Sequence, residues 1–320
     1  MCSHPKFIGI GAIKSGTTWL HQALGQHPGA WVPYVKELRY FNQPEYNLLQ
    51  RLRGGTAGRY DYGYWQRQLL QFLRHPGIRR SDRLRYIAWH LFYFFWPRSP
   101  RWYTSLFPSD DRVTGEITPL YAPIPEDKIE RAARHFPDLK LIYLLRDPIA
   151  RLWSHIRMRC LGLPNVDFNA DRLTEELILH TIEERDLNDR WLFRHSRYAA
   201  TLDRWLRFFP REQLFVGYLH DIKTQPQTLL RELGDFLGLA PEDFDHDTLL
   251  EKHNPKPIDM DLPPVLETIF ARRLLDDLRD LDDQLNDDPV TAWRERAERA
   301  AQRPVPTSSR FAGAAAPVLP

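Results

Sequence analysis

The feature that most constrains the fold is a glycine-bounded loop near the amino terminus, between an apolar run and a helical pattern. Residues 7–10 (Phe-Ile-Gly-Ile) predict a buried strand, and the pattern from Gly16 onward predicts a helix. The turn between them, from Gly11 to Ser15, would bring backbone N–H groups and the positive end of the helix dipole to one point. The sequence therefore predicts an anion-binding loop at the end of a first β-strand.

The position of the lysine separates this loop from the common nucleoside-triphosphatase pattern. That pattern is G-x-x-x-x-G-K-[ST]. Gly11 and Gly16 keep its spacing, but Thr17 stands where the lysine is expected, and Lys14 lies inside the loop. In the common pattern the lysine contacts the β- and γ-phosphates and the next hydroxyl holds Mg²⁺. The shifted lysine favours a different phosphate ester, handled without a metal.

The segment from Lys14 to Trp19 resembles the 5′-phosphosulfate-binding loop of sulfotransferases that use 3′-phosphoadenosine-5′-phosphosulfate (PAPS). The resemblance implies that backbone amides, the lysine and the hydroxyls of this loop bind the 5′-phosphate of the donor. The donor contacts that it implies are Lys14, Ser15, Gly16, Thr17, Thr18 and Trp19. In cytosolic members of the family the tryptophan stacks on adenine; packing in the core is the alternative for Trp19.

The rest of the chain predicts an α/β fold. Apolar runs at 139–145 and 214–219 predict strands, a weaker run lies at 113–116, and helical patterns separate them. Residues 224–227 have the form of a capping box, and Gly238 is placed to end the helix that follows. This alternation predicts a three-layer fold of the P-loop type, with a central, mainly parallel sheet flanked by helices. Ligands of such sheets bind beyond the carboxyl ends of the strands.

A second candidate anion site follows the strand at 139–145. Arg146 leaves the strand end and Ser154 lies two helical turns later, so both side chains can reach one anion. The pair resembles the 3′-phosphate site of the same family, which implies that Arg146 and Ser154 bind the 3′-phosphate of the donor. Arg151 is a further candidate, with a surface ion pair to Asp147 as the alternative. In a kinase, Asp147 would be the Walker-B carboxylate.

The catalytic base is predicted from a third segment, Lys36-Glu37-Leu-Arg39-Tyr40-Phe41. It resembles the Lys-Glu-x-x-(Tyr/Phe)-Phe element of Golgi heparan-type sulfotransferases and their bacterial relatives. In those enzymes the glutamate takes the proton of the acceptor hydroxyl, so the resemblance implies Glu37 as base, with Lys14 as the catalytic cation. His155 is the alternative base, because cytosolic members of the family use histidine.

Three further segments match the family less completely. Residues 115–121 resemble a segment beside the acceptor cleft of the same relatives, in which Glu116 either assists the base or fixes a turn. The sequence Ser196-Arg197-Tyr198 resembles the start of a family helix, and Tyr198 is included among the donor-site candidates. Lys256 lies where a basic loop closes over the nucleotide in relatives, although the Arg-Lys-Gly triplet of cytosolic members is absent.

The resemblance covers about residues 6–285 and predicts one sulfotransferase domain over 1–302. Within it, about 45–100 form an insert rich in arginine and aromatic residues. This insert has three alternative interpretations: an acceptor-binding or lid subdomain, a peripheral membrane contact, or a helical subdomain with its own core. Its apolar block at 86–96 predicts a buried helix and is too short to span a bilayer. The composition of 303–320 predicts a disordered tail.

Charge and cysteine content exclude some classes of partner and of binding site. With 44 Lys and Arg against 42 Asp and Glu, the net charge of +2 argues against a nucleic-acid partner. Cys2 and Cys160 are the only cysteines, which excludes a disulfide framework and a cysteine-rich metal site. Few residues precede the first strand, so no signal peptide is expected. We expect a cytoplasmic protein.

These observations give one leading hypothesis and two alternatives. The leading hypothesis is in-line transfer of a sulfuryl group from PAPS to a hydroxyl of a carbohydrate, lipid or other small molecule, leaving adenosine 3′,5′-bisphosphate and requiring no metal. The alternatives are a P-loop kinase that uses ATP and Mg²⁺, and a nucleotide-binding or membrane-associating module without catalysis. The sequence indicates neither the acceptor nor the oligomeric state.

Overall fold

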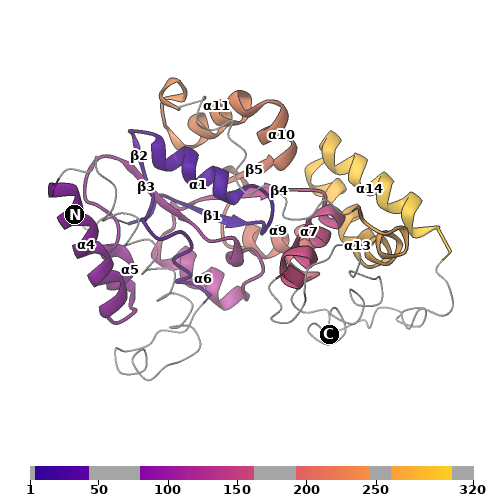
Figure 1. The fold of residues 1–320 in the computed structure, drawn as a ribbon, viewed down its shortest axis with the longest axis horizontal. Coiled ribbons are helices and arrows are strands. Elements are labelled where there is room, and N and C mark those ends of the chain that lie inside the picture. Colours follow the sequence, from indigo (N-terminus) through magenta and orange to yellow (C-terminus); the bar gives the residue numbers. More distant parts are fainter. Residues whose placement is uncertain (1–3, 43–79, 162–191, 245–260, 305–320) are drawn as a thin grey trace.

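The computed structural model describes residues 4–42, 80–161, 192–244 and 261–304, and its centre is a five-stranded sheet (Figure 1). The strand order is β2-β3-β1-β4-β5, and each neighbouring pair is parallel. The strands are β1 (Phe7–Gly11), β2 (Ala30–Trp31), β3 (Val113–Ile117), β4 (Lys140–Leu145) and β5 (Leu214–Tyr218). The predicted α/β fold with a central parallel sheet is confirmed.

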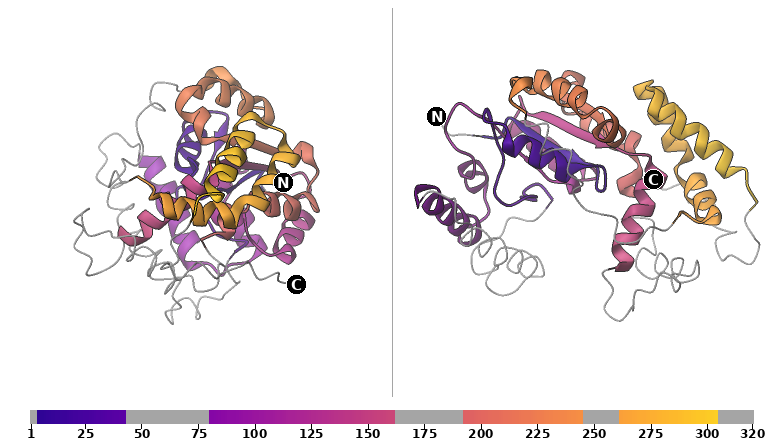
Figure 2. Two further views of the ribbon diagram at one scale, coloured as in Figure 1. Left: turned by 90° about the vertical axis from the view of Figure 1, so that its right-hand side faces the viewer. Right: turned by 45° about the horizontal axis from the view of Figure 1, so that its top comes forward.

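Helices cover both faces of this sheet (Figures 1 and 2). One face carries α1 (Thr17–Gln26), α10 (Leu219–Thr224) and α11 (Pro226–Leu237), and the other carries α6 (Glu126–His135) and α9 (Tyr198–Leu206). The pair α4 (Arg80–Phe95) and α5 (Pro100–Ser105) lies on the opposite side of the molecule from α7 (Pro148–Leu161), α13 (Pro264–Leu285) and α14 (Asp288–Ala301). Short 3₁₀ helices are η1 (Pro119–Tyr121), η3 (Arg194–Ser196), η4 (Arg211–Gln213) and η5 (Pro241–Asp243).

The apolar run of β4 explains why the sheet is buried on both faces. Successive side chains of a strand point to opposite faces. Leu141, Tyr143 and Leu145 pack in the core cluster that includes α9, whereas Ile142 and Leu144 pack in the cluster that includes α1 and α11. A nearly continuous apolar sequence is therefore what a central parallel strand requires.

The helix α11 shows one end that the sequence predicts and one that it does not. Gly238 ends the helix with φ 76°, and the amides of Gly238 and Leu239 both bond to the carbonyl of Gly234, at 2.8 and 2.9 Å. The predicted capping box is wrong. Thr224 belongs to α10, where its hydroxyl donates to the carbonyl of His220, and no side chain caps the start of α11.

The described part of the predicted insert joins the main core. The helix predicted at 86–96 is confirmed as α4, and its Tyr93 and Phe94 belong to the same buried cluster as Trp102 and Tyr103 of α5. Residues 43–79 of the insert and the predicted tail from 305 lie outside the described residues. Among the helices that are described, none has the length and apolar character needed to cross a membrane.

Arg151 is a buried structural residue rather than a surface partner of Asp147. Its side chain is inaccessible to solvent, and burial lowers its pKa to about 10. The guanidinium donates to the Ser196 hydroxyl at 2.7 Å and to the Leu192 carbonyl at 2.8 Å, and it lies 3.3 Å from Nδ1 of His155. The surface ion pair with Asp147, the alternative to a phosphate contact, is therefore wrong, and Arg151 instead ties α7 to η3.

We expect Arg151→Lys to lower the free energy of unfolding by about 2–4 kcal/mol, because one ammonium cannot replace three divergent guanidinium contacts and leaves buried acceptors unpaired. Urea denaturation measures this change. The matched control is Arg207→Lys, since Arg207 is 61% exposed and pairs with Glu126 on the surface. We expect that control to change stability by less than about 1 kcal/mol. Equal losses in the two variants would contradict a structural role for Arg151.

Candidate active site

The loop after β1 has the backbone of an anion-binding turn. The strand ends at Gly11, α1 begins at Thr17, and Gly16 precedes the helix with φ 92°. A Cβ on Gly16 would lie 2.5 Å from the terminal methyl Cδ1 of Ile222, and the positive φ is what favours glycine here. The first amides of an α-helix have no carbonyl partner within the helix, so this end of α1 can bind an anion.

Arg146 connects the end of β4 with this loop. Its Nη1 donates to the carbonyl of Lys14 at 3.3 Å, and its own carbonyl accepts a hydrogen bond from the Tyr198 hydroxyl at 3.0 Å. Ser154, half-buried, lies on α7, which begins two residues after Arg146. Because β1 and β4 are neighbours in the sheet, the two phosphate-binding elements predicted from separate motifs lie side by side.

Four cations from separate segments influence one another at this end of the sheet. Burial lowers the pKa of Lys14, and Arg146 and Arg157 lower it further. Burial likewise lowers the pKa of Arg146, Tyr198 and Asp147 oppose that shift, and Arg157 adds to it. For Lys36, burial lowers the pKa most, Glu37 opposes the shift, and Lys14 adds to it. Partly buried positive charges that repel one another fit a polyanionic ligand.

Lys36 lies between the loop and the candidate base. Its Nζ donates to the Thr18 hydroxyl at 3.0 Å and lies 3.8 Å from Oε1 of Glu37. No separate role for Lys36 or Arg157 was predicted from the sequence. Two features of the sequence could have indicated a role for them: Lys36 is adjacent to Glu37, and Arg157 lies one helical turn after Ser154.

Glu37 is held in a strained segment at the same site. Its Oε2 accepts a hydrogen bond from Nη2 of Arg39 at 2.9 Å, and its side chain is one quarter exposed. In the described residues, four non-glycine residues have positive φ: Lys14 (70°), Glu37 (69°), Arg39 (57°) and Asn286 (53°). Three of them lie at this site. Backbone strain of this kind gathers where the surrounding structure holds functional groups in place.

Other candidates lie deeper in the protein. Trp19 is 6% exposed and packs in the cluster of α1 and α11, so it has a packing role, and stacking on adenine stays a prediction. His155 is 1% exposed and faces Arg151. Ser15 is buried beside Tyr198, whose pKa burial raises to about 12. Lys256 lies outside the described residues.

Asp147 is engaged in structure rather than placed as a Walker-B ligand. Its Oδ1 accepts from the amides of Ile149 and Ala150 at 2.9 and 3.1 Å and so caps α7. Its Oδ2 accepts from Arg296 of α14 at 2.7 Å. Across the described ranges, no group of three or more His, Cys, Asp or Glu side chains is placed to hold a metal ion.

The helices α13 and α14 support the same edge of the sheet. Besides the Arg296 contact, Asp287 accepts a hydrogen bond from Tyr218 at the end of β5. Asp277 of α13 accepts from the amides of Ala199 and Ala200 at the start of α9, and burial raises its pKa to about 6. These helices therefore brace the strand ends from which Arg146 extends.

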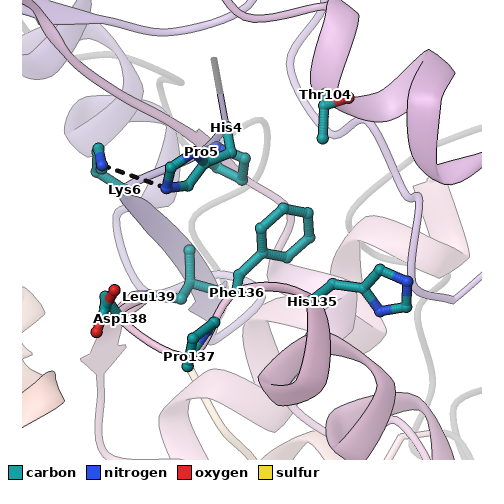
Figure 3. A pocket seen from close by; sticks show the side chains of 9 residues that line it. All are labelled: His4, Pro5, Lys6, Thr104, His135, Phe136, Pro137, Asp138 and Leu139. Atoms are coloured by element: carbon teal, nitrogen blue, oxygen red, sulfur yellow. Dashed lines mark hydrogen bonds between the residues drawn. The ribbon is translucent and has the colours of Figure 1, made fainter. Parts of the chain in front are cut away.

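A surface cavity of about 380 Å³ lies at the opposite edge of the sheet (Figure 3). Lys6 and Leu139, which precede β1 and β4, line it together with His4, Thr104 and His135. Because ligands of parallel α/β sheets bind at the carboxyl ends of the strands, this cavity is distinct from the candidate active site.

Comparison with known proteins gives one consistent result. A model described as the Sulfotransferase family matches residues 5–243. Human heparan sulfate glucosamine 3-O-sulfotransferase 6 is 31% identical over 180 residues, which cover 54% of this chain and 48% of the human protein. Mouse carbohydrate sulfotransferase 15 is 24% identical over 330 aligned positions, covering 91% of this chain and 54% of the mouse protein. The chain thus spans about half the length of these curated relatives.

A solved structure supports the fold. The crystal structure of a sulfotransferase from Alicyclobacillus acidocaldarius superposes with a TM-score of 0.61 at 22% identity, covering 91% of this chain and 99% of that one. The helices α13 and α14, which brace the site, follow the part of the chain that the family model matches.

We expect Gly16→Ala to weaken the binding of adenosine 3′,5′-bisphosphate at least about tenfold, because Ala at a φ of 92° strains the backbone of the loop. Isothermal titration calorimetry measures the affinity. Gly25→Ala is the matched control: Gly25 lies inside α1, and its added Cβ would approach Val32 no closer than 3.3 Å. Unchanged affinity in Gly16→Ala would contradict the assignment of the loop.

Proposed function

Since the chain belongs to the sulfotransferase family, we propose that it transfers a sulfuryl group from PAPS to a hydroxyl group of an acceptor. The observation that carries the proposal is the contact of Arg146 with the Lys14 loop, which unites the two predicted phosphate sites. The donor has negative charge at both its 3′- and 5′-positions, and the site offers cations on both of these elements.

The residues present fit this donor. We assign the 5′-phosphate to the loop residues Ser15, Gly16, Thr17 and Thr18 with Lys14, and the 3′-phosphate to Arg146 and Ser154. The lowered pKa of Lys14 supports this assignment, because a bound anion would offset the burial of the ammonium and the repulsion from Arg146 and Arg157. Arginine suits the 3′-position since its planar guanidinium can engage two phosphate oxygens.

PAPS, when bound, supplies the sulfuryl group and a nucleotide bisphosphate leaving group. The Glu37 carboxylate would accept the proton of the acceptor hydroxyl and so raise the nucleophilicity of its oxygen. The Lys14 ammonium, at the loop, would offset negative charge that develops on the leaving side. Lys36 joins these two groups, since it contacts both Thr18 of the loop and Glu37.

Glu37 is a better candidate for the base than His155. Its carboxylate is one quarter exposed and lies beside Lys36 at the loop. His155 is buried, and its Nδ1 lies against the guanidinium of Arg151, which can only donate. A proton acceptor must reach the substrate, and this favours Glu37.

We propose a carbohydrate hydroxyl as the acceptor. The support is the names of two relatives, a heparan sulfate glucosamine 3-O-sulfotransferase and a carbohydrate sulfotransferase. Lipid and other small-molecule hydroxyls would present the same attacking oxygen. Incubation with labelled PAPS and a native extract, followed by mass spectrometry of the product, identifies the acceptor. The cytoplasmic setting stays a prediction.

We expect Glu37→Gln to lower kcat for sulfuryl transfer by about 10²–10⁴-fold, because glutamine has the same shape but cannot accept the proton. Affinity for adenosine 3′,5′-bisphosphate should stay within about threefold of the wild-type value, a free-energy change under about 1 kcal/mol. Glu126→Gln is the matched control, since Glu126 pairs with Arg207 on the surface. Wild-type activity in Glu37→Gln would exclude Glu37 as the base.

We also expect binding of adenosine 3′,5′-bisphosphate to take up protons at alkaline pH. The pKa of Lys14 is lowered in the free protein, and a bound phosphate would raise it. Between these two pKa values binding takes up a proton, so the association constant falls as the pH rises. Calorimetry at a series of pH values above about 8, where phosphate monoesters are fully ionised, measures the uptake in buffers that differ in ionisation enthalpy. Equal uptake by Lys14→Met would disprove the assignment.

A further inference from the structure

We infer that Glu116 is a positioning residue that sets the catalytic base, Glu37, in place; this inference rests on the proposed function. Glu116 lies near the end of β3 and is 1% exposed. Its Oε1 accepts hydrogen bonds from the hydroxyls of Tyr103 at 2.9 Å and Tyr121 at 2.7 Å. Its Oε2 accepts from the Thr118 hydroxyl at 2.7 Å and from the amide of Leu38 at 3.1 Å.

The hydrogen bonds of this cluster continue into the segment that follows Glu37. The amide of Arg39 donates to the Thr118 hydroxyl at 3.3 Å, and the amide of Tyr40 donates to the Tyr121 hydroxyl at 2.8 Å. The amide of Leu38 also donates to Glu116. Three consecutive backbone amides after Glu37 therefore donate either to Glu116 or to a hydroxyl that is bonded to Glu116.

The directions of these bonds show which form of the Glu116 side chain, carboxylate or carboxylic acid, the cluster is arranged to bind. The hydroxyl oxygens of Thr118 and Tyr121 accept from backbone amides, so each hydroxyl proton is available for the Glu116 carboxylate. A carboxylate can accept all four bonds, whereas a protonated acid would have to donate one. Burial raises the pKa of Glu116, and the four hydrogen bonds oppose that shift. The four donors are therefore arranged to bond the two oxygens of a carboxylate.

Strain in the segment explains why it needs this support. Glu37 and Arg39 have φ of 69° and 57°, in the left-handed region that side chains with a Cβ disfavour. The three amide bonds hold the backbone between and after these two residues. Without them the segment can relax to an ordinary conformation, and the Glu37 carboxylate would leave its position beside Lys36.

Glu116 acts through the backbone rather than on the substrate. It is buried, its described partners are Leu38, Tyr103, Thr118 and Tyr121, and these leave no acceptor position on the carboxylate open to a ligand. A shift of about 1 Å in a reacting group can lower a rate about 10²-fold. Loss of the cluster should therefore lower kcat without weakening donor binding.

Two tyrosines give a matched test of this role. Tyr103 and Tyr121 are both fully buried and both donate to Oε1 of Glu116, but the hydroxyl of Tyr121 also accepts the amide of Tyr40. A purely structural role predicts similar effects of Tyr103→Phe and Tyr121→Phe on kcat. A positioning role predicts a larger effect of Tyr121→Phe on kcat, measured where both variants are fully folded.

The experiment compares wild-type protein with Tyr103→Phe, Tyr121→Phe and Glu116→Gln. We expect Tyr121→Phe and Glu116→Gln to lower kcat about 10–100-fold, with unchanged affinity for adenosine 3′,5′-bisphosphate. Tyr103→Phe should lower kcat less than about threefold, a change under about 1 kcal/mol. Equal reductions by the two tyrosine variants would overturn the inference while leaving sulfuryl transfer by the wild-type protein intact.

Hydrogen exchange provides a readout that does not depend on activity. Amides 38–40 should exchange faster in Tyr121→Phe and Glu116→Gln than in wild-type protein, and at the wild-type rate in Tyr103→Phe. Unchanged exchange in Tyr121→Phe and Glu116→Gln would overturn the positioning role. Absence of sulfuryl transfer by wild-type protein, with this exchange pattern present, would instead overturn the proposed function.

Discussion

The candidate site depends on the parallel pairing of three neighbouring strands, β3, β1 and β4. Because the strands run in the same direction, their carboxyl ends meet at one edge of the sheet. The end of β1 provides the Lys14 loop, the end of β4 provides Arg146, and the end of β3 provides the Glu116 cluster that holds the segment after Glu37. Each part of the proposed chemistry therefore comes from a different strand, and the backbone hydrogen bonds of the sheet set their spacing.

This edge concentrates unfavourable interactions that the rest of the fold must offset. Cations of several segments are partly buried near one another, which lowers the pKa of Lys14, Lys36 and Arg146. Three non-glycine residues at the edge have positive φ. The compensation comes from apolar clusters on both faces of the sheet and from α13 and α14, which contact Asp147 and the start of α9. A site prepared for a polyanion in this way gains stability when the anion binds.

The sequence predicts elements whose signal is local, and it misses contacts that only the tertiary structure creates. The apolar run of β4, the glycine turn before α1 and the end of α11 at Gly238 were predicted correctly because neighbouring residues determine them. The prediction of a capping box at Thr224 was wrong because Thr224 lies in α10. Neither alternative for Arg151, a phosphate contact or a surface ion pair, included its burial, because its partners, Ser196 and Leu192, are more than 40 positions away. Its burial, like the cluster around Glu116, could not be derived from spacing along the chain.

The proposed function requires that one site bind a nucleotide through both its 3′- and its 5′-phosphate. The most direct measurement is calorimetric titration of wild-type protein with adenosine 3′,5′-bisphosphate and, separately, with adenosine 5′-phosphate. We expect one molecule bound per chain and an affinity at least about tenfold higher for the bisphosphate, because a charge-assisted contact such as that of Arg146 contributes roughly 1.5–3 kcal/mol. Equal affinities for the two nucleotides, or no binding of the bisphosphate, would contradict it.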